Sequence, residues 1–301
     1  MSLEFELYEE KRRKMRRFSF LKGSAVTIIF IVVAMFIWNE DIVPSPHIAM
    51  FKVVGEIYDD SNRDRILNEI AENENVVGVI VKINSPGGSV VGAEALYESL
   101  TSISKKKPVV VSIGEIGASA AYLVALAGDK IFARGNSLVG SVGVIVQYPD
   151  LSKLAEFLGV SMQVIKSGEV KGGVNIIGPS NARAIKNQES LVNDSFVWFK
   201  NLVSERRKLS GIDLEKISDG QLFTGRMALD LGLIDAIGST EQAIKYFQTR
   251  GKKFQGISVR DWSEEQSQSM FWKTFLGLDT SILGTNKIKF LQSPMLFSIV
   301  S

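Results

Sequence analysis

Short runs of β-branched residues alternate with longer amphipathic stretches from residue 48 onward. Val76–Ile83 (VVGVIVKI) is apolar at nearly every position, which is typical of a strand buried on both faces of a sheet. The runs predict strands at Ile48–Val54, Val76–Ile83, Pro108–Ile113, Ile131–Ala133, Gly143–Gln147 and Met162–Ile165. The amphipathic stretches predict helices at Asn62–Glu72, Ser89–Ser104, Ala118–Ala127, Leu151–Leu158 and Asn181–Leu209, and a helix, turn and short strand at Met227–Ile237. This alternation predicts an α/β fold with a mainly parallel sheet and crossover helices.

The first 40 residues follow another pattern. Residues 11–17 are lysine and arginine except for Met15, and Phe18 to Trp38 is uncharged except for Lys22, which can extend toward lipid head groups. A helix over this stretch would measure about 31 Å, close to the hydrocarbon thickness of a bilayer. We expect a basic cytoplasmic segment at 1–17, a transmembrane anchor at 18–39 and a linker at 40–47. No A-x-A-like cleavage site follows the span, and the preceding cations put the rest of the chain across the membrane.

Composition removes several classes of site. Among 301 residues there is no cysteine, which excludes disulfides, thiolate metal sites and cysteine nucleophiles. The net charge of +2 gives no global field that would favour nucleic acid, and the sequence predicts no cofactor. The one histidine, His47, is expected in the solvated linker, so a Ser-His-Asp triad is not expected.

Two small-residue turns follow predicted strands. Asn84–Ser89 (NSPGGS) contains a Pro-Gly turn whose uncovered N–H groups, beside a helix N-terminus, can hold an oxyanion. Gly114–Tyr122 (GEIGASAAY) places Ser119 between alanines where a strand gives way to an apolar helix. Taken alone, the first turn could be an ordinary connection and Ser119 a helix cap. Both turns, however, fall at the carboxyl edge of one sheet, where α/β proteins bind ligands.

A serine nucleophile needs a base, and in this chain a lysine is the remaining candidate. At pH 7 only about one lysine in a few thousand is neutral, unless burial lowers its pKa. Lys166 ends an apolar run and enters the turn Ser167-Gly168. Spacing alone does not choose it over Lys130 or Lys153.

Taken together, the chain resembles the signal peptide peptidase A family of bacterial serine proteases, in its short form with one α/β unit. The resemblance covers roughly Ile48 to Phe247. The matching segments, in order, are Asn84–Gly88, Gly114–Tyr122, Ala127–Ala133, Gly140–Val144, Ile165–Gly168 and Phe223–Asp235. The family usually has Gly-Gly after the nucleophile, whereas this chain has Ala120-Ala121.

The resemblance implies a crotonase/Clp-like protease domain at 48–250, followed by a C-terminal extension at 251–301. It implies Ser119 as nucleophile, Lys166 as general base and Ser141 as hydrogen-bond partner of the lysine. The oxyanion hole would use the N–H groups of Gly87 and Ala120, with Gly88 as an alternative to Gly87. It further implies an enzyme of the bacterial inner membrane that hydrolyses leftover signal peptides, bound as extended strands, in a homo-oligomer whose sites draw on neighbouring protomers.

Three other functions stay open. A related Ser/Lys membrane protease of the nodulation-efficiency type acts on membrane-protein tails, and its nucleophile segment can also carry alanines after the serine. A crotonase relative would bind an acyl-CoA thioester, although an exported domain has no ready supply of CoA. An assembly factor would keep the fold without activity.

Overall fold

The computed structural model describes residues 11–13, 15–16, 19–20, 22–31, 45–263 and 297–298, the last two by backbone alone. The chain divides into two compact units, Met1–Ser45 and Pro46–Ser301. The described residues of the first unit between 11 and 31 are helical. No helix within the described stretches has the length and apolarity needed to cross a membrane. Residues 32–39 of the predicted anchor lie outside the described residues.

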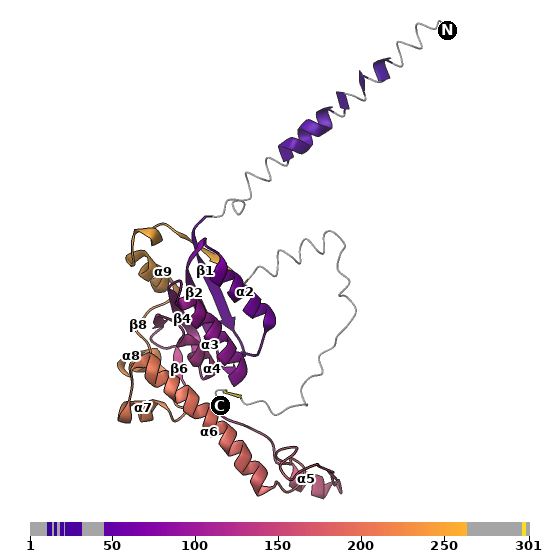
Figure 1. The fold of residues 1–301 in the computed structure, drawn as a ribbon, viewed down its shortest axis with the longest axis vertical. Coiled ribbons are helices and arrows are strands. Elements are labelled where there is room, and N and C mark those ends of the chain that lie inside the picture. The colour runs from indigo at the N-terminus through magenta and orange to yellow at the C-terminus, as the bar shows by residue number, and fades with distance from the viewer. Residues whose placement is uncertain are drawn as a thin grey trace, which may run out of the picture. The chain divides into compact units, whose positions relative to one another are not determined.

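The second unit alternates strands and helices around one eight-stranded sheet (Figure 1). Its strands are β1 (His47–Val54), β2 (Val76–Ser85), β4 (Val109–Ala118), β5 (Lys130–Ala133), β6 (Leu138–Gly140), β7 (Leu222–Thr224), β8 (Ala236–Ile237) and β9 (Ser258–Asp261). Its helices are α2 (Ser61–Glu72), α3 (Val90–Ser104), α4 (Ala120–Ala125), α5 (Ser152–Phe157), α6 (Ala182–Arg207), α7 (Gly211–Ile217), α8 (Gly225–Asp230) and α9 (Thr240–Thr249), with a 3-10 turn at η2 (Lys252–Phe254). A separate two-stranded ladder joins β3 (Gly88–Ser89) to β10 (Phe297–Ser298).

The sheet order is β7-β6-β4-β2-β1-β9, with β5 and β8 continuing from β4. Every pairing in it is parallel except that of β6 with β7. The predicted α/β class and parallel sheet are therefore confirmed.

The sheet is covered on both faces because its strands are apolar on both. Alternate residues of β1, β2 and β4, such as Phe51, Val81 and Val111, join a core with α2, α3, α4 and α6. The intervening residues, such as Ile80 and Val110, pack with Phe247 of α9. This two-sided burial is the reason for the nearly continuous apolar runs in the sequence.

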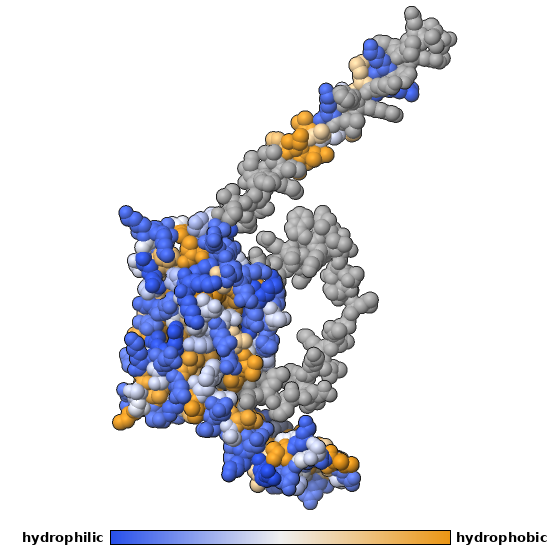
Figure 2. Space-filling model, in the orientation of Figure 1, coloured by the Kyte–Doolittle hydropathy of each residue, from blue (hydrophilic) through white to orange (hydrophobic). Residues whose placement is uncertain are grey.

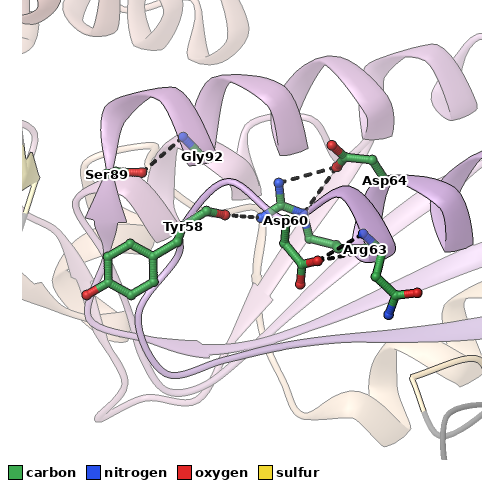
Figure 3. A network of polar contacts seen from close by, with 7 residues as sticks. Tyr58, Asp60, Arg63, Asp64, Ser89 and Gly92 are labelled. Atoms are coloured by element: carbon green, nitrogen blue, oxygen red, sulfur yellow. Dashed lines mark hydrogen bonds and ion pairs between the residues drawn. The ribbon is translucent and has the colours of Figure 1, made fainter. Parts of the chain in front are cut away.

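Asp60, Ser89 and Ser239 show why three helices begin where they do. Each cap side chain accepts a hydrogen bond from a backbone N–H of the first helical turn, as Figure 3 shows for Ser89 and Asp60. Arg63 joins the same network, since it donates to the Tyr58 carbonyl (2.7 Å) and contacts Asp64. The contacts of Asp60 and Arg63 stabilise the connection between β1 and α2.

Two predicted strands are wrong. Residues 143–147 and 162–165 form no strand, and Ile165 is fully exposed. A strand requires a neighbouring strand, and no segment described in the chain pairs with 162–165. The helix predicted from Ala118 begins instead at Ala120, because β4 continues to Ala118.

The expectation that His47 is solvated is also wrong. His47 begins β1 and is buried, and its Nε2 accepts a hydrogen bond from Trp262 Nε1 (3.1 Å). The two rings are stacked, with centroids 5.9 Å apart. The burial arises because β9 pairs with β1 and brings Trp262 beside the start of that strand.

Tyr122 of α4 is hydrogen-bonded to the loop between α8 and β8. Its side chain is fully buried, and its hydroxyl donates to the Leu233 carbonyl (2.8 Å). Burial raises the pKa of this hydroxyl, so it stays protonated as a donor.

Tyr122→Phe removes that donor and leaves a buried carbonyl without its partner. We expect the free energy of unfolding to fall by about 1–3 kcal/mol, measured by urea denaturation. Tyr97→Phe is the control, since the Tyr97 hydroxyl has no partner among the described residues. Equal effects of the two substitutions would contradict this assignment.

Candidate active site

The candidate site begins where β4 changes partners. Residues 110–113 of β4 pair with β5, whereas residues 116–118 pair with β6. Between them, the Asn84 side-chain oxygen accepts hydrogen bonds from the backbone N–H groups of Glu115 (3.1 Å) and Ile116 (3.2 Å). Asn84 therefore fixes the bend that carries β4 toward Ser119.

Ser119 lies in the sharp turn between β4 and α4. Its backbone has φ 56° and ψ −124°, a conformation that residues other than glycine rarely adopt. The turn is held on both sides, because the Ser119 N–H donates to the Gly140 carbonyl (2.7 Å) and its carbonyl accepts from Leu123 N (3.0 Å). Such strained positions cost about 1–3 kcal/mol and cluster at functional sites.

The Ser119 side chain does not cap α4, so the simple structural explanation for this serine does not apply. Ser119 is only 1 % exposed, and Ala118, Ala120 and Ala121 around it are fully buried. Ala120 begins the helix, where backbone N–H groups have no intrahelical acceptor. At least one backbone N–H at the start of α4 is therefore available to donate a hydrogen bond to a reacting carbonyl placed beside Ser119.

The Gly87-Gly88 turn lies against the 55–60 segment. Ile57 N donates to the Gly87 carbonyl and Ser89 N donates to the Ile57 carbonyl, both at 2.8 Å. A Cβ on Gly88 would come within 2.0 Å of the Ile57 carbonyl oxygen, so the close approach requires glycine. Gly87 N–H already donates to the Ser85 hydroxyl oxygen (3.2 Å).

Strand register brings three of these turns to one edge of the sheet. Ser85 is opposite Gly117 between β2 and β4, and Ala118 is opposite Gly140 between β4 and β6. β3 also contacts α4. The structure thus groups the Gly87-Gly88 turn, the Ser119 turn and the Gly140-Ser141 turn.

Ser141 has an unusual backbone as well. Its φ is 53°, its side chain is largely buried, and its N–H donates to the Gln221 carbonyl (2.6 Å). The structural contributions of Asn84 and Gln221 were not predicted from the sequence. For Asn84 a signal existed, because an amide side chain directly follows a buried strand; for Gln221, in a loop far along the chain, none did.

Lys166 lies on another part of the unit. It is exposed, and its Nζ donates one hydrogen bond, to the Glu169 carbonyl (3.5 Å). It lines a pocket formed by residues between Met162 and Asn181, which does not include Ser119 or Ser141. Within a single chain, Lys166 and Ser119 are therefore not hydrogen-bonded.

The segment that carries Lys166 exposes many apolar side chains. We call residues 148–165 the apolar arm; Phe157 is 85 % exposed and Ile165 is fully exposed. Figure 2 shows apolar side chains gathered on the lobe that Figure 1 labels α5. An apolar surface of this kind marks an interaction site more often than a solvated face.

Comparison with known proteins gives two family matches. The model described as peptidase family S49 matches residues 101–254, more than half of the chain. The model described as Clp protease matches residues 51–139, which run from within β1 to within β6 and include Ser119.

Three similar proteins illustrate the relationship. A protein of Synechocystis named as a candidate protease is 33% identical over 71% of this chain and 77% of its own length. A candidate signal peptide peptidase SppA of Enterococcus faecium is 28% identical over 70% of this chain and 61% of its own. The chloroplastic serine protease SPPA of Arabidopsis thaliana is 27% identical over 59% of this chain and 26% of its own.

The backbone conformation of Ser119 gives a testable prediction. Glycine adopts φ 56°, ψ −124° without the steric cost that alanine bears, so Ser119→Gly should be more stable than Ser119→Ala by about 1–3 kcal/mol. Denaturant unfolding of both variants measures the difference. At Ser112, in the middle of β4, the order should reverse, with glycine less stable than alanine. The same order at both positions would show that the Ser119 turn is not strained.

Proposed function

Since the chain belongs to peptidase family S49, as its resemblance to the signal peptide peptidase A family predicted, we propose that it is a serine endopeptidase of membranes that uses Ser119 as nucleophile and Lys166 as base. The observation that carries the proposal is the strained backbone of Ser119. This residue lies beside the Gly87-Gly88 turn, and its hydroxyl does not cap α4. A position that costs stability and has no structural use for its side chain indicates a catalytic use.

The reaction follows from these groups. The Ser119 hydroxyl oxygen attacks the scissile carbonyl carbon while its proton passes to the neutral amine of Lys166. The negative oxygen that develops is stabilised by backbone N–H groups. The protonated lysine then gives its proton to the departing amine, and water hydrolyses the acyl-enzyme by the same steps, with the lysine again as base.

We assign the two oxyanion donors to Ala120 and Gly88. The Ala120 N–H begins α4 directly after the nucleophile. Gly88 is favoured over Gly87 because the Gly87 N–H already donates to Ser85 within the turn. Ser141 is proposed to orient the lysine by a hydrogen bond, as the resemblance implies.

We propose that Lys166 acts on Ser119 of a second copy. The pocket that Lys166 lines includes neither Ser119 nor Ser141, so this lysine is not placed to act on the serine of its own chain. Burial of the apolar arm against another copy would remove Phe157, Leu158 and Ile165 from water and desolvate Lys166 in the same step. The incomplete site and the uncovered apolar surface then have one explanation.

The proposed substrates are signal peptides left in the membrane. The apolar stretch that includes residues 22–31 would anchor the enzyme at the bilayer, with its N-terminus in the cytoplasm and its catalytic unit on the other side. The Ala120-Ala121 pair keeps the membrane-protein-tail alternative open. Cleavage of a synthetic signal peptide against a stomatin-like tail peptide separates these substrates.

The first experiment tests the nucleophile. A serine-directed fluorophosphonate should label Ser119, as mapped by mass spectrometry, and Ser119→Ala should lose both labelling and peptide hydrolysis while keeping the fold. Ser112→Ala is the control and should retain labelling. Labelling at another serine, or hydrolysis by Ser119→Ala, would overturn the assignment.

The second experiment tests the shared site. Ser119→Ala and Lys166→Ala should each be inactive, but chains co-expressed in equal amounts should regain about one quarter of wild-type activity, because a random pair of neighbours supplies one intact serine and one intact lysine in one case of four. Co-expression of Ser119→Ala with the Ser119→Ala/Lys166→Ala double variant is the control and should stay inactive. If the first mixture also stays inactive, both residues act within one chain.

A further inference from the structure

Basic side chains gather where strands β4 and β5 begin. Three consecutive lysines follow α3, Lys130 begins β5, and Arg250 follows α9. The three lysines and Arg250 line one pocket of about 340 Å³. We call the five cations the basic edge: Lys105, Lys106, Lys107, Lys130 and Arg250.

The Tyr246 ring joins the members of the basic edge that come from different elements. Tyr246 lines the same pocket, and Lys130 Nζ lies 4.7 Å from the centroid of its ring. Arg250 Cζ lies 5.7 Å from the same centroid. The negative face of an aromatic ring attracts cations, so Tyr246 holds these two side chains close together in spite of their repulsion.

Two of the five cations have a structural use. Lys107 Nζ donates to the Ile70 and Asn73 carbonyls, both at 2.7 Å, and so satisfies backbone groups at the end of α2. Lys106 pairs with Glu72 (2.9 Å), but both side chains are exposed, and such pairs contribute little to stability.

Lys105 and Arg250 have no such use. Both are exposed, and neither forms an ion pair with another residue that the structure describes. Asp129 is the one acid among the described residues that line the pocket, and its carboxylate accepts a hydrogen bond from the Val109 N–H (2.8 Å). The positive charge of the pocket is therefore not neutralised from within the chain.

The opposite edge of the sheet, which carries the candidate site, has the opposite charge. Residues 55–60, 86–89 and 114–119 contain no lysine or arginine. They contain four acids: Glu56, Asp59, Asp60 and Glu115. The small net charge of +2 thus conceals a separation of charge along the strand direction.

The basic edge is also the edge at which the chain enters the sheet. β1, β2, β4 and β5 are consecutive parallel neighbours, so β5 begins about three strand spacings, or roughly 14 Å, from β1. Under the proposed anchoring, residues up to 39 lie in the bilayer. At most about 28 Å of extended chain then connects them to His47 at the start of β1.

We propose that the basic edge docks the second unit onto anionic lipid head groups. The inference goes beyond the proposed function and takes from it only the membrane anchoring. Anionic lipid is favoured over an acidic peptide because the cations lie beside the point at which the chain arrives from the bilayer. Each lysine or arginine close to an anionic surface favours docking about fivefold, and salt screens the effect.

A fluorescence experiment on the full-length protein in vesicles tests the docking. Because the chain has no cysteine, Ser104→Cys gives a single labelling site in the pocket. A fluorophore there should be quenched by nitroxide-labelled head groups when phosphatidylglycerol is present. It should not be quenched in phosphatidylcholine alone, or in 1 M salt, where the screening length is about 3 Å. Ser61→Cys, next to the acidic segment 55–60, is the matched control and should stay unquenched.

Removal of two cations measures their contribution. In the Ser104→Cys background, Lys105→Gln combined with Arg250→Gln should lower the ratio of docked to undocked protein about 25-fold. Lys186→Gln combined with Lys216→Gln removes the same charge from exposed positions on α6 and α7. This control should leave the ratio unchanged.

Three results would overturn the proposal: quenching at residue 104 that does not depend on phosphatidylglycerol, equal quenching at residues 61 and 104, or equal losses in the two double variants. Binding of a soluble polyglutamate peptide to the pocket, without quenching by lipid, would identify an acidic peptide as the partner instead.

The outcome is separate from that of the proposed function. No readout requires hydrolysis, so failure of the fluorophosphonate to label Ser119 leaves the result intact. Flotation with vesicles in 1 M salt reports the anchor alone. If the protein leaves the vesicles there, the anchoring is wrong, and quenching at low salt still decides whether the basic edge binds anionic lipid.

Discussion

The hydrogen bond from the Ser119 N–H to the Gly140 carbonyl is the contact on which the site depends. It is the last rung of the pairing between β4 and β6, and it holds a serine in a backbone conformation that an unsupported chain would leave. β6 is itself supported by β7 through the antiparallel pairing at residues 138–140. The nucleophile turn is therefore stabilised by the sheet around it rather than by its own sequence.

The dependence of the site on the surrounding sheet also explains which features could be predicted from the sequence. The buried strands β1, β2 and β4 and the helices between them follow from local composition, because each apolar run can be satisfied only by a sheet covered on both faces. The two small-residue turns, Asn84–Ser89 and Gly114–Tyr122, were predicted as a site because the carboxyl ends of parallel strands lie at one edge of the sheet. Family membership was readable from motif order along the chain.

What the sequence could not predict depends on contacts between distant segments. Nothing near His47 indicates that Trp262 stacks on it, because β9 lies more than two hundred residues away. Residues 162–165 have the composition of a strand but no neighbouring strand in the described chain, so propensity alone misled the prediction. The environment of Lys166 could not be predicted either, since it depends on what covers the apolar arm.

The position of β1 in the sheet has a mechanical consequence. The chain enters the second unit through β1, which is hydrogen-bonded on one side to β2 and on the other to β9, both in parallel. A tensile load applied at residue 46 would run along the strand axis and would have to shear two ladders at once instead of peeling one edge strand. A unit attached to its surroundings at this point can be pulled without losing the sheet that shapes its turns.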